Sequence, residues 1–369
     1  MNFQFNRWHS SGYLPFEELM EAGQQIKSYD EVTPLMIQLA EKAEQENDNI
    51  KAAFYYRFAE FFCFRSEAEK KELYNKFIDL FYKAFGSEVK QINVPYENGY
   101  LNAIHLSPKN ETIKATILMH GGGDSFIEEF YSIARATANF GFEIIMFEGP
   151  GQGRPLNQYD LKMTHEWEKP TKTILDYFNL EDVTLVGISL GGYFSLRVAA
   201  FESRIKRVVA YDVVYDFFKC VFGRNGFLKY FIINNLTMLN ASKIINRIIE
   251  KQMEQNPFVK WLFEHSFHVH DVKTPFDFLK RLKRYSTANF SKLIKQDVLL
   301  LAGKDDHIIP FRMYKKQRRK LKNAKTLSGR AFSKEEHASS HCQVGNIMLA
   351  VNTIKNWIET KIKGENEKE

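Results

Sequence analysis

A serine stands between two glycines at the point where an apolar run gives way to an amphipathic one. The run 183–186 continues into Gly-Ile-Ser-Leu-Gly at 187–191, and a helical pattern follows at once. In an open parallel sheet, a sharp strand-turn-helix raises one side chain above the sheet edge and surrounds it with backbone N–H groups. Such a position suits a nucleophile, and Ser189 is the candidate. Gly187 and Gly191 allow the tight bend, although a purely structural turn is the alternative interpretation.

A serine hydroxyl needs a base, and the base needs an orienting carboxylate. In a sheet of this kind the expected order along the chain is serine, acid, histidine. Asp305 and Asp306 follow an apolar run that ends at Gly303, so either carboxylate could reach the edge that carries the serine. We choose Asp306, which stands three residues after Gly303 and four before Pro310.

Two histidines near the C-terminus could act as the base. His341 lies nearest the start of the last expected helix, where the chain should fold back over the sheet edge. His337 lies in a charged loop of small residues and is expected to be exposed. We therefore favour His341. His307 directly follows the chosen acid and is too close to it to face it across a site, so we assign it a lid or loop contact.

A loop of three glycines supplies a candidate oxyanion hole. The sequence Leu-Met-His-Gly-Gly-Gly-Asp follows an apolar run that begins at 115. Unobstructed N–H groups at such a place stabilise negative charge on a carbonyl oxygen. We expect one donor from Leu190, next to the nucleophile, and another from Gly122 or Gly123. A flexible glycine loop without function would not explain why the glycines follow a core strand.

The spacing of apolar residues predicts the elements that carry these side chains. Apolar strands that alternate with helices indicate a mostly parallel α/β sheet covered on both faces. Asn98-Gly99, between two alternating stretches, predicts a hairpin at the start of the sheet. The predicted division is an N-terminal helical domain (1–88), the first part of the core (89–212), a helical lid (213–295), the second part of the core (296–362) and a mobile tail (363–369).

Composition excludes several classes of protein. The 369 residues are 44% hydrophobic and 26% charged, and the formal net charge of +6 is too mild to argue for nucleic acid. The three cysteines are scattered without a C-x-x-C pair, so neither a disulfide framework nor a thiolate zinc site is indicated. Apolar runs are too short for a signal peptide or a spanning helix. We expect a cytoplasmic protein with a small-molecule substrate, no cofactor or metal, and no nucleic-acid or membrane partner. A homodimer is left open.

Taken together, the motifs resemble the α/β-hydrolase superfamily over about residues 89–362. HGGGD, FEGPGQG, GISLGG, AGKDDHIIP and HCQVGN stand in that order. With the N-terminal helices and the helical insertion, they are similar to a branch that includes 2,6-dihydroxypseudooxynicotine hydrolase, fungal pigment polyketide-shortening hydrolases and acylaminoacyl-peptidase-like esterases. The resemblance implies a triad formed by Ser189, Asp306 and His341.

Some members of that branch are proposed to use an acid after the strand that follows the nucleophile helix. This chain offers Asp212 and Asp216 for such a role. The resemblance therefore leaves a second acid open.

The residues and the resemblance together predict a serine hydrolase that cleaves an ester or amide through an acyl-enzyme. Hydrolysis of a carbon–carbon bond in a β-diketone is one alternative, and a non-catalytic binding or regulatory module is another. Aromatic residues in the lid range would favour an apolar or aromatic substrate, although a helical lid also needs a core of its own. These residues are Phe217, Phe218, Phe222, Phe227 and Trp261.

Overall fold

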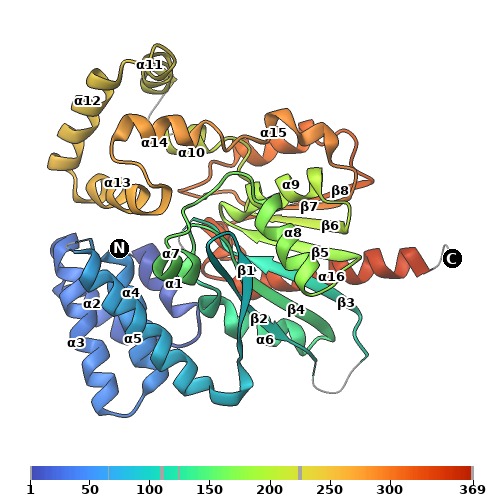
Figure 1. Ribbon diagram of the computed structural model, residues 1–369, viewed down its shortest axis with the longest axis horizontal. Helices are drawn as coiled ribbons and strands as arrows, with labels where there is room; N and C mark the ends of the chain where they lie inside the picture. Colours follow the sequence, from blue (N-terminus) through green and yellow to red (C-terminus); the bar gives the residue numbers. More distant parts are fainter. Residues whose placement is uncertain (1, 65, 109–111, 124, 223–226, 367–369) are drawn as a thin grey trace. The chain divides into compact units, whose positions relative to one another are not determined.

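An eight-stranded, mostly parallel sheet organises one part of the structure (Figure 1). The computed structural model describes residues 2–64, 66–108, 112–123, 125–222 and 227–366. The strand order is β1-β2-β4-β3-β5-β6-β7-β8; β2 pairs antiparallel with β1 and β4, and the remaining pairs are parallel. The strands are β1 (Gln91–Tyr96), β2 (Gly99–Leu106), β3 (Ala115–His120), β4 (Phe142–Glu148), β5 (Val183–Ile188), β6 (Ile205–Tyr211), β7 (Asp297–Gly303) and β8 (Thr326–Phe332). The predicted α/β class is confirmed.

Helices cover both faces of this sheet, as the sequence predicts. Figure 1 shows α8 and α9 on one face and α6 and α16 on the other. The helices that accompany the sheet are α6 (Tyr131–Ala138), α7 (Gly153–Tyr159), α8 (Glu168–Tyr177), α9 (Gly191–Phe201), α10 (Phe217–Phe222), α11 (Phe227–Met238), α14 (Pro275–Leu282), α15 (Arg312–Lys320) and α16 (Ile347–Asn366). Single 3-10 turns lie at Tyr29–Glu31, Gly86–Glu88, Ile127–Phe130, Thr287–Asn289, Ser291–Leu293 and His341–Gln343.

The central strands β5, β6 and β7 end side by side. β5 and β7 are buried along their whole length, which explains why they read as continuous rather than alternating apolar runs. Ile188 pairs with Tyr211, and Tyr211 pairs in turn with Leu301. Because parallel strands share one carboxyl edge, the residues that follow these three strands emerge close together.

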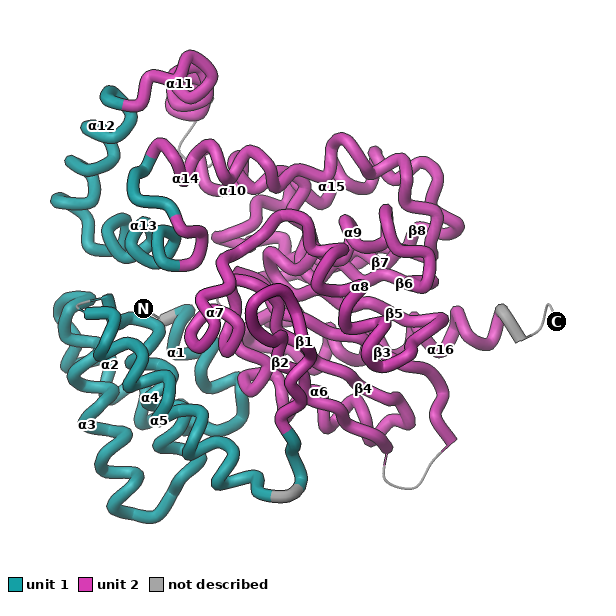
Figure 2. Tube along the Cα trace, viewed as in Figure 1, with its two compact units in different colours: residues 1–90, 243–268, 272–275 teal, residues 91–242, 269–271, 276–369 magenta. Residues whose placement is uncertain are grey.

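The chain forms two compact units (Figure 2). The helical unit contains Met1–Lys90, Lys243–His268 and Val272–Pro275, and the sheet unit contains Gln91–Ser242, Val269–Asp271 and Phe276–Glu369. The range 213–295, predicted as one lid, is helical, and its central part belongs to the helical unit. Residues 223–226 of that range, and 367–369 of the predicted tail, lie outside the described residues.

The helical unit begins with five helices, in agreement with the predicted helical N-terminus. They are α1 (Asn2–His9), α2 (Phe16–Gln25), α3 (Val32–Gln45), α4 (Asn49–Phe62) and α5 (Glu67–Phe85), and α12 (Ser242–Gln255) and α13 (Pro257–His270) lie mainly in the same unit. The indole N–H of Trp261 on α13 donates to the carbonyl of Phe61 on α4 at 3.0 Å. The Trp261 ring also lies 5.1 Å from the Phe61 ring and stacks on His265. Segments far apart in the sequence thus share one aromatic cluster.

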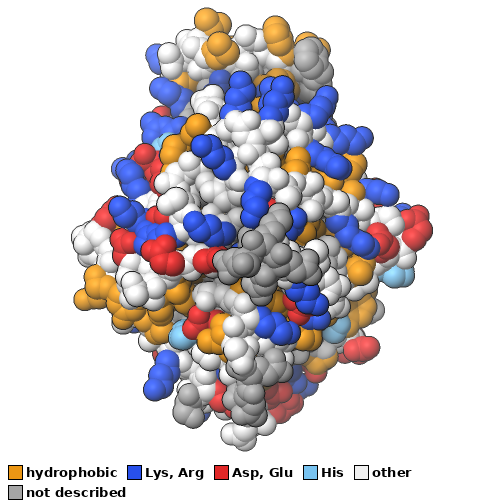
Figure 3. Space-filling model, turned by 90° about the vertical axis from the view of Figure 1, so that its right-hand side faces the viewer, with side chains coloured by type: hydrophobic (Ala, Val, Ile, Leu, Met, Phe, Trp, Pro, Cys, Tyr) orange, Lys and Arg blue, Asp and Glu red, His pale blue; other side chains and the backbone are white. Residues whose placement is uncertain are grey.

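The basic run at 315–320 lies on the outer face of α15. Met313, Tyr314 and Gln317 form the buried face of this helix, while Arg318 and Arg319 are exposed. On the face of the molecule drawn in Figure 3, Lys and Arg side chains are spread among acidic and uncharged ones. Among the described residues, no helix combines the length and the apolar character needed to cross a membrane.

Glycines let the start of α9 approach the neighbouring strands closely. A Cβ added to Gly187 would lie 2.0 Å from the carbonyl oxygen of Gly191. A Cβ added to Gly192 would lie 1.7 Å from the carbonyl oxygen of Asp212 at the end of β6. Neither position has room for a side chain, because backbone atoms on both sides cannot move without displacing a strand or the helix.

We expect Gly192→Ala to destabilise the protein strongly. The added methyl group must push α9 away from β6, so the free energy of unfolding should fall by roughly 3 kcal/mol. The matched control is Gly364→Ala, because a Cβ there meets nothing within 4 Å and alanine favours the helix. Thermal unfolding followed by circular dichroism would compare the two. Equal melting temperatures would contradict the proposed packing constraint.

Candidate active site

Ser189 occupies the sharp turn between β5 and α9. Its φ of 61° lies in the left-handed region, which costs a residue other than glycine about 1–3 kcal/mol. Backbone hydrogen bonds hold this conformation: the Ser189 N–H donates to the carbonyl of Tyr211 at 2.5 Å, and the Ser189 carbonyl accepts from Gly192 N–H at 2.9 Å. The turn therefore presents the hydroxyl at the carboxyl edge of the sheet.

His341 joins Ser189 to Asp306. Its Nε2 lies 2.9 Å from Ser189 Oγ, and its Nδ1 lies 2.8 Å from Asp306 Oδ2. A carboxylate only accepts, so Nδ1 carries a proton, and in the neutral imidazole Nε2 accepts from the serine hydroxyl. The alternative base, His337, is exposed, and His307 lies on the solvent side with its ring centre 6.5 Å from that of His341. The structure thus brings the three predicted side chains together.

Backbone donors fix the carboxylate of Asp306. Its Oδ1 accepts the N–H groups of Ile308 at 2.7 Å and Ile309 at 2.8 Å, which leaves Oδ2 for the imidazole. Burial alone would raise the pKa of Asp306, but His341 and these hydrogen bonds lower it overall. Asp306 is therefore charged where it meets the imidazole. Its neighbour Asp305 is exposed.

A second buried carboxylate approaches the same nitrogen of His341. Asp212 follows β6, and its Oδ2 lies 3.3 Å from His341 Nδ1. Oδ2 also accepts Cys342 N–H at 2.8 Å, and Oδ1 accepts the side-chain amide of Gln343 at 3.1 Å. Burial raises the pKa of Asp212, and the charge of Asp306 raises it further. Asp216, the other acid left open by the sequence, instead binds the backbone and the ammonium group of Lys219.

The surroundings of His341 favour its protonated form. Burial works against the imidazolium, but the neighbouring Cys342 and the carboxylates of Asp306 and Asp212 raise the pKa of His341 well above its usual range. The imidazole consequently keeps a second proton to a higher pH than a free histidine does. One donor atom of Cys342 also lies within 4.8 Å of donor atoms of Asp212 and His341, so these three residues could hold a metal ion.

The glycine loop after β3 lies against the N-terminus of α9. A Cβ added to Gly122 would lie 2.9 Å from Leu190 N, so only glycine leaves space beside that N–H group. Gly122 already donates its own N–H to Ser125 Oγ at 3.2 Å. Between the two predicted glycine donors, this contact leaves Gly123 as the stronger candidate. Leu190 is the N-cap residue of α9. The first N–H groups of a helix have no hydrogen-bond partner within the helix, which suits the Leu190 N–H to the role of a donor.

Two residues that the sequence interpretation did not single out support this loop. His120 is fully buried, and its Nδ1–H donates to the carbonyl of Gly121 at 3.0 Å. Burial lowers the pKa of His120 to about 4, so the ring is neutral. The side-chain amide of Gln152 donates to the carbonyl of Gly122 at 2.6 Å. The available signals were the position of His120 directly before the glycines and the position of Gln152 within the motif FEGPGQG.

Comparisons with known proteins identify the family and the fold of the chain. Residues 115–220 match the family described as alpha/beta hydrolase fold. The 20-hydroxy-prefusarin hydrolase FUS2 of Gibberella moniliformis is 30% identical over 299 residues, which cover 72% of this chain and 70% of that protein. The hydrolase LUC6 of Fusarium sp is 29% identical over 280 residues, covering 69% of this chain. The match spans 66% of LUC6 and 46% of the Aspergillus aculeatus hydrolase acrC, so it leaves part of both relatives uncovered.

A solved structure has a similar fold over most of the chain. The crystal structure of the 2,6-dihydroxy-pseudo-oxynicotine hydrolase superimposes with a TM-score of 0.66, covering 95% of this chain and 94% of that one. The sequence identity is 16%. At that identity the likeness is one of fold.

We expect Asp212→Asn to lower the pKa of His341. The carboxylate at 3.3 Å stabilises the imidazolium, so its replacement by a neutral amide of the same shape should lower that pKa. NMR titration of protein with selectively labelled histidine would measure the change. Asp216→Asn is the matched control and should leave the titration of His341 unchanged. A shift of the same size in both variants would contradict the assignment of Asp212.

Proposed function

The chain belongs to the α/β-hydrolase family, and on that premise we propose that it is a serine hydrolase that cleaves a carboxylic ester or amide. One observation carries the proposal: an unbroken run of hydrogen bonds leads from Ser189 Oγ through His341 to Asp306. When the imidazole is neutral, the hydroxyl faces an unprotonated ring nitrogen whose other nitrogen is oriented by a carboxylate, which makes it an activated nucleophile.

In the first half of the proposed reaction, Ser189 Oγ forms a bond to the carbonyl carbon of the substrate while His341 Nε2 accepts the hydroxyl proton. Asp306 stabilises the imidazolium that results. His341 then gives the proton to the departing alcohol or amine as its bond to the carbonyl carbon breaks. The acyl group remains on Ser189 as an ester.

The developing negative charge on the carbonyl oxygen needs donors beside the nucleophile. We assign these to the N–H groups of Leu190 and Gly123. The proximity of Gly122 to Leu190 N supports the assignment, since it brings the glycine loop to the N-terminus of α9. Removing one such donor typically costs a few kcal/mol of transition-state stabilisation.

Water completes the second half. The oxygen of the water attacks the acyl carbon while His341 accepts a proton from the water. The imidazolium then returns that proton to Ser189 Oγ as the ester bond breaks. The acid product leaves, and the free hydroxyl and neutral imidazole are restored.

Partly exposed aromatic side chains on α10 support an apolar or aromatic acyl group. Phe217 and Phe222 are half-buried, whereas Phe218 is buried and packs on Phe222 with 5.1 Å between ring centres. Among the other residues considered for this role, Trp261 packs within the helical unit, and the side chain of Phe227 lies outside the described residues. Phe217 and Phe222 are therefore the residues to test in substrate selection.

Ser189→Ala should reduce turnover of a short p-nitrophenyl ester by roughly 10⁴-fold or more, because no other group can form the acyl-enzyme. Ser195, a buried serine on α9, provides the matched control: Ser195→Ala should keep activity, and circular dichroism would check its fold. A fluorophosphonate probe should label wild type and fail to label Ser189→Ala.

The outcomes separate the candidate functions. A wild-type protein that takes no probe and hydrolyses nothing would favour a non-catalytic module. Turnover of β-diketones without turnover of esters or aminoacyl anilides would keep Ser189 as nucleophile but change the bond that is cleaved. Ester turnover that survives Ser189→Ala would refute the mechanism.

The rate constant kcat/KM should fall with decreasing pH, with a midpoint above about 6.5. His341 accepts a proton only when neutral, and its raised pKa moves that requirement to higher pH. A stopped-flow or steady-state profile between pH 5 and about 10 would measure the midpoint. His341→Ala should abolish activity, whereas His337→Ala, at an exposed position, should retain it. A flat profile down to pH 5 would contradict a histidine base.

A further inference from the structure

Asp212, His341 and Cys342 lie close together, and each has a side chain that can bind a metal ion. A donor atom from each of Asp212, His341 and Cys342 lies within 4.8 Å of the other two. Asp212 and His341 are buried, and Cys342 is half-buried. The N–H of Cys342 donates to Asp212 Oδ2 at 2.8 Å, and its carbonyl accepts from the hydroxyl of Tyr211 at 2.9 Å. The backbone therefore anchors the thiol beside the carboxylate and the imidazole.

The ligand set selects the ion. Ca²⁺ and Mg²⁺ prefer oxygen ligands alone, whereas one sulfur, one nitrogen and one oxygen suit Zn²⁺ with its tetrahedral geometry. Zn²⁺ places its ligand atoms about 3.5 Å apart, because each bond is about 2.0–2.3 Å long. Asp212 Oδ2 and His341 Nδ1 are already 3.3 Å apart, so it is the thiol of Cys342 that must move toward them.

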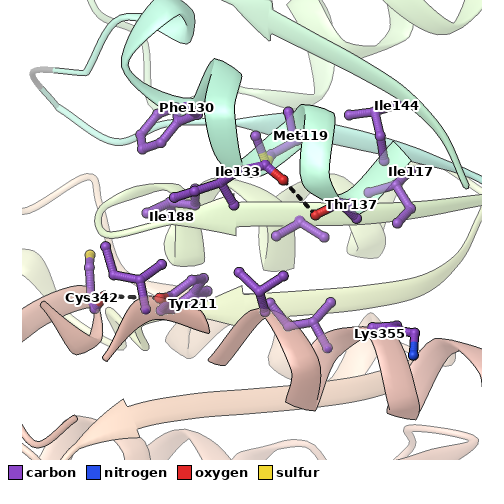
Figure 4. Close-up of a pocket in the computed structure, with 15 residues that line it drawn as sticks. Ile117, Met119, Phe130, Ile133, Thr137, Ile144, Ile188, Tyr211, Cys342 and Lys355 are labelled. Atoms are coloured by element: carbon purple, nitrogen blue, oxygen red, sulfur yellow. Dashed lines mark hydrogen bonds between the residues drawn. The ribbon is translucent and has the colours of Figure 1, made fainter. Parts of the chain in front are cut away.

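The thiol has room for that adjustment. Cys342 borders an apolar cavity of about 80 Å³ that lies between α6 and α16 (Figure 4). Ile188 and Tyr211 line the same end of the cavity. The side chain of Cys342 is therefore not tightly packed on every side.

We propose that Asp212, His341 and Cys342 form an inhibitory Zn²⁺ site, in which the ion is bound by an Asp212 oxygen, His341 Nδ1 and Cys342 Sγ. Nδ1 is the ring nitrogen that faces Asp212, at 3.3 Å. On binding, the thiol releases its proton to solvent and forms the Zn–S bond. Nδ1 gives up its proton as the Zn–N bond forms, and the bound imidazole keeps one proton on Nε2. In the imidazolium Nε2 already carries that proton and the Nδ1 proton leaves to solvent, whereas in the neutral ring the single proton moves from Nδ1 to Nε2.

Inhibition follows from the change of tautomer. With Zn²⁺ on Nδ1, the hydrogen bond from His341 to Asp306 is lost. Nε2 now carries a hydrogen that faces Ser189 Oγ and can no longer accept the serine proton. This consequence rests on the proposed serine-hydrolase function, whereas the binding of the ion does not.

The first test is zinc inhibition of ester hydrolysis in metal-buffered solution. Wild type should lose activity with increasing free Zn²⁺ and regain it on addition of a chelator. Cys342→Ser, compared with its own zinc-free rate, should need at least tenfold more Zn²⁺ for half inhibition. Cys220→Ser is the matched control, because Cys220 is a buried cysteine on α10 outside the cluster. Equal sensitivity of wild type and Cys342→Ser would overturn the site.

The second test does not depend on activity. Ser189→Ala retains all three proposed ligands, so isothermal titration calorimetry should find one tight Zn²⁺-binding site per chain. The double variant Ser189→Ala with Cys342→Ser should lose that site. If the protein binds Zn²⁺ tightly but lacks hydrolase activity, the proposed zinc site is supported and the proposed function is refuted. Hydrolase activity without tight binding in Ser189→Ala would refute the inference alone.

Discussion

The candidate site depends on the contacts of one imidazole, that of His341, which lies between a hydroxyl and two buried carboxylates. Ser189, Asp212 and Asp306 follow β5, β6 and β7, and they converge because these parallel strands end at one edge. The two carboxylates are not equivalent. Backbone N–H groups hold Asp306 in its charged form, whereas burial raises the pKa of Asp212. His341 thus has one firmly charged partner and one whose charge is costly to bury.

Close backbone packing supports this contact. Gly192 lets α9 approach the carbonyl of Asp212, and Gly122 lets the loop after β3 approach Leu190 N. The same few atoms therefore determine how the helix packs, where the second carboxylate lies and where an oxyanion could be stabilised. Because His120 stays neutral in its buried position, the loop gains a hydrogen-bond donor without adding a charge beside the site.

Local sequence patterns predicted the fold class and the helical N-terminus, because the spacing of apolar residues and the length of apolar runs can be recognised within a short segment. For the site, position after a strand nominated Ser189 and Asp306, and position before the last helix nominated His341; their catalytic roles remain predictions. The sequence could not show that Asp212, rather than Asp216, approaches His341. That depends on where β6 ends and on how the chain around His341 folds back. The raised pKa of His341 was equally hidden, because it results from charges contributed by separate elements.

The aromatic contact between Trp261 and Phe61 has a consequence for the order of biosynthesis. A ribosome releases the first ninety residues early, yet the segment that completes their cluster emerges only after β1–β6 have been made. Until then the nascent helices keep part of their aromatic surface uncovered in the cell. The two pieces of the helical unit therefore have to associate across a long intervening stretch of chain.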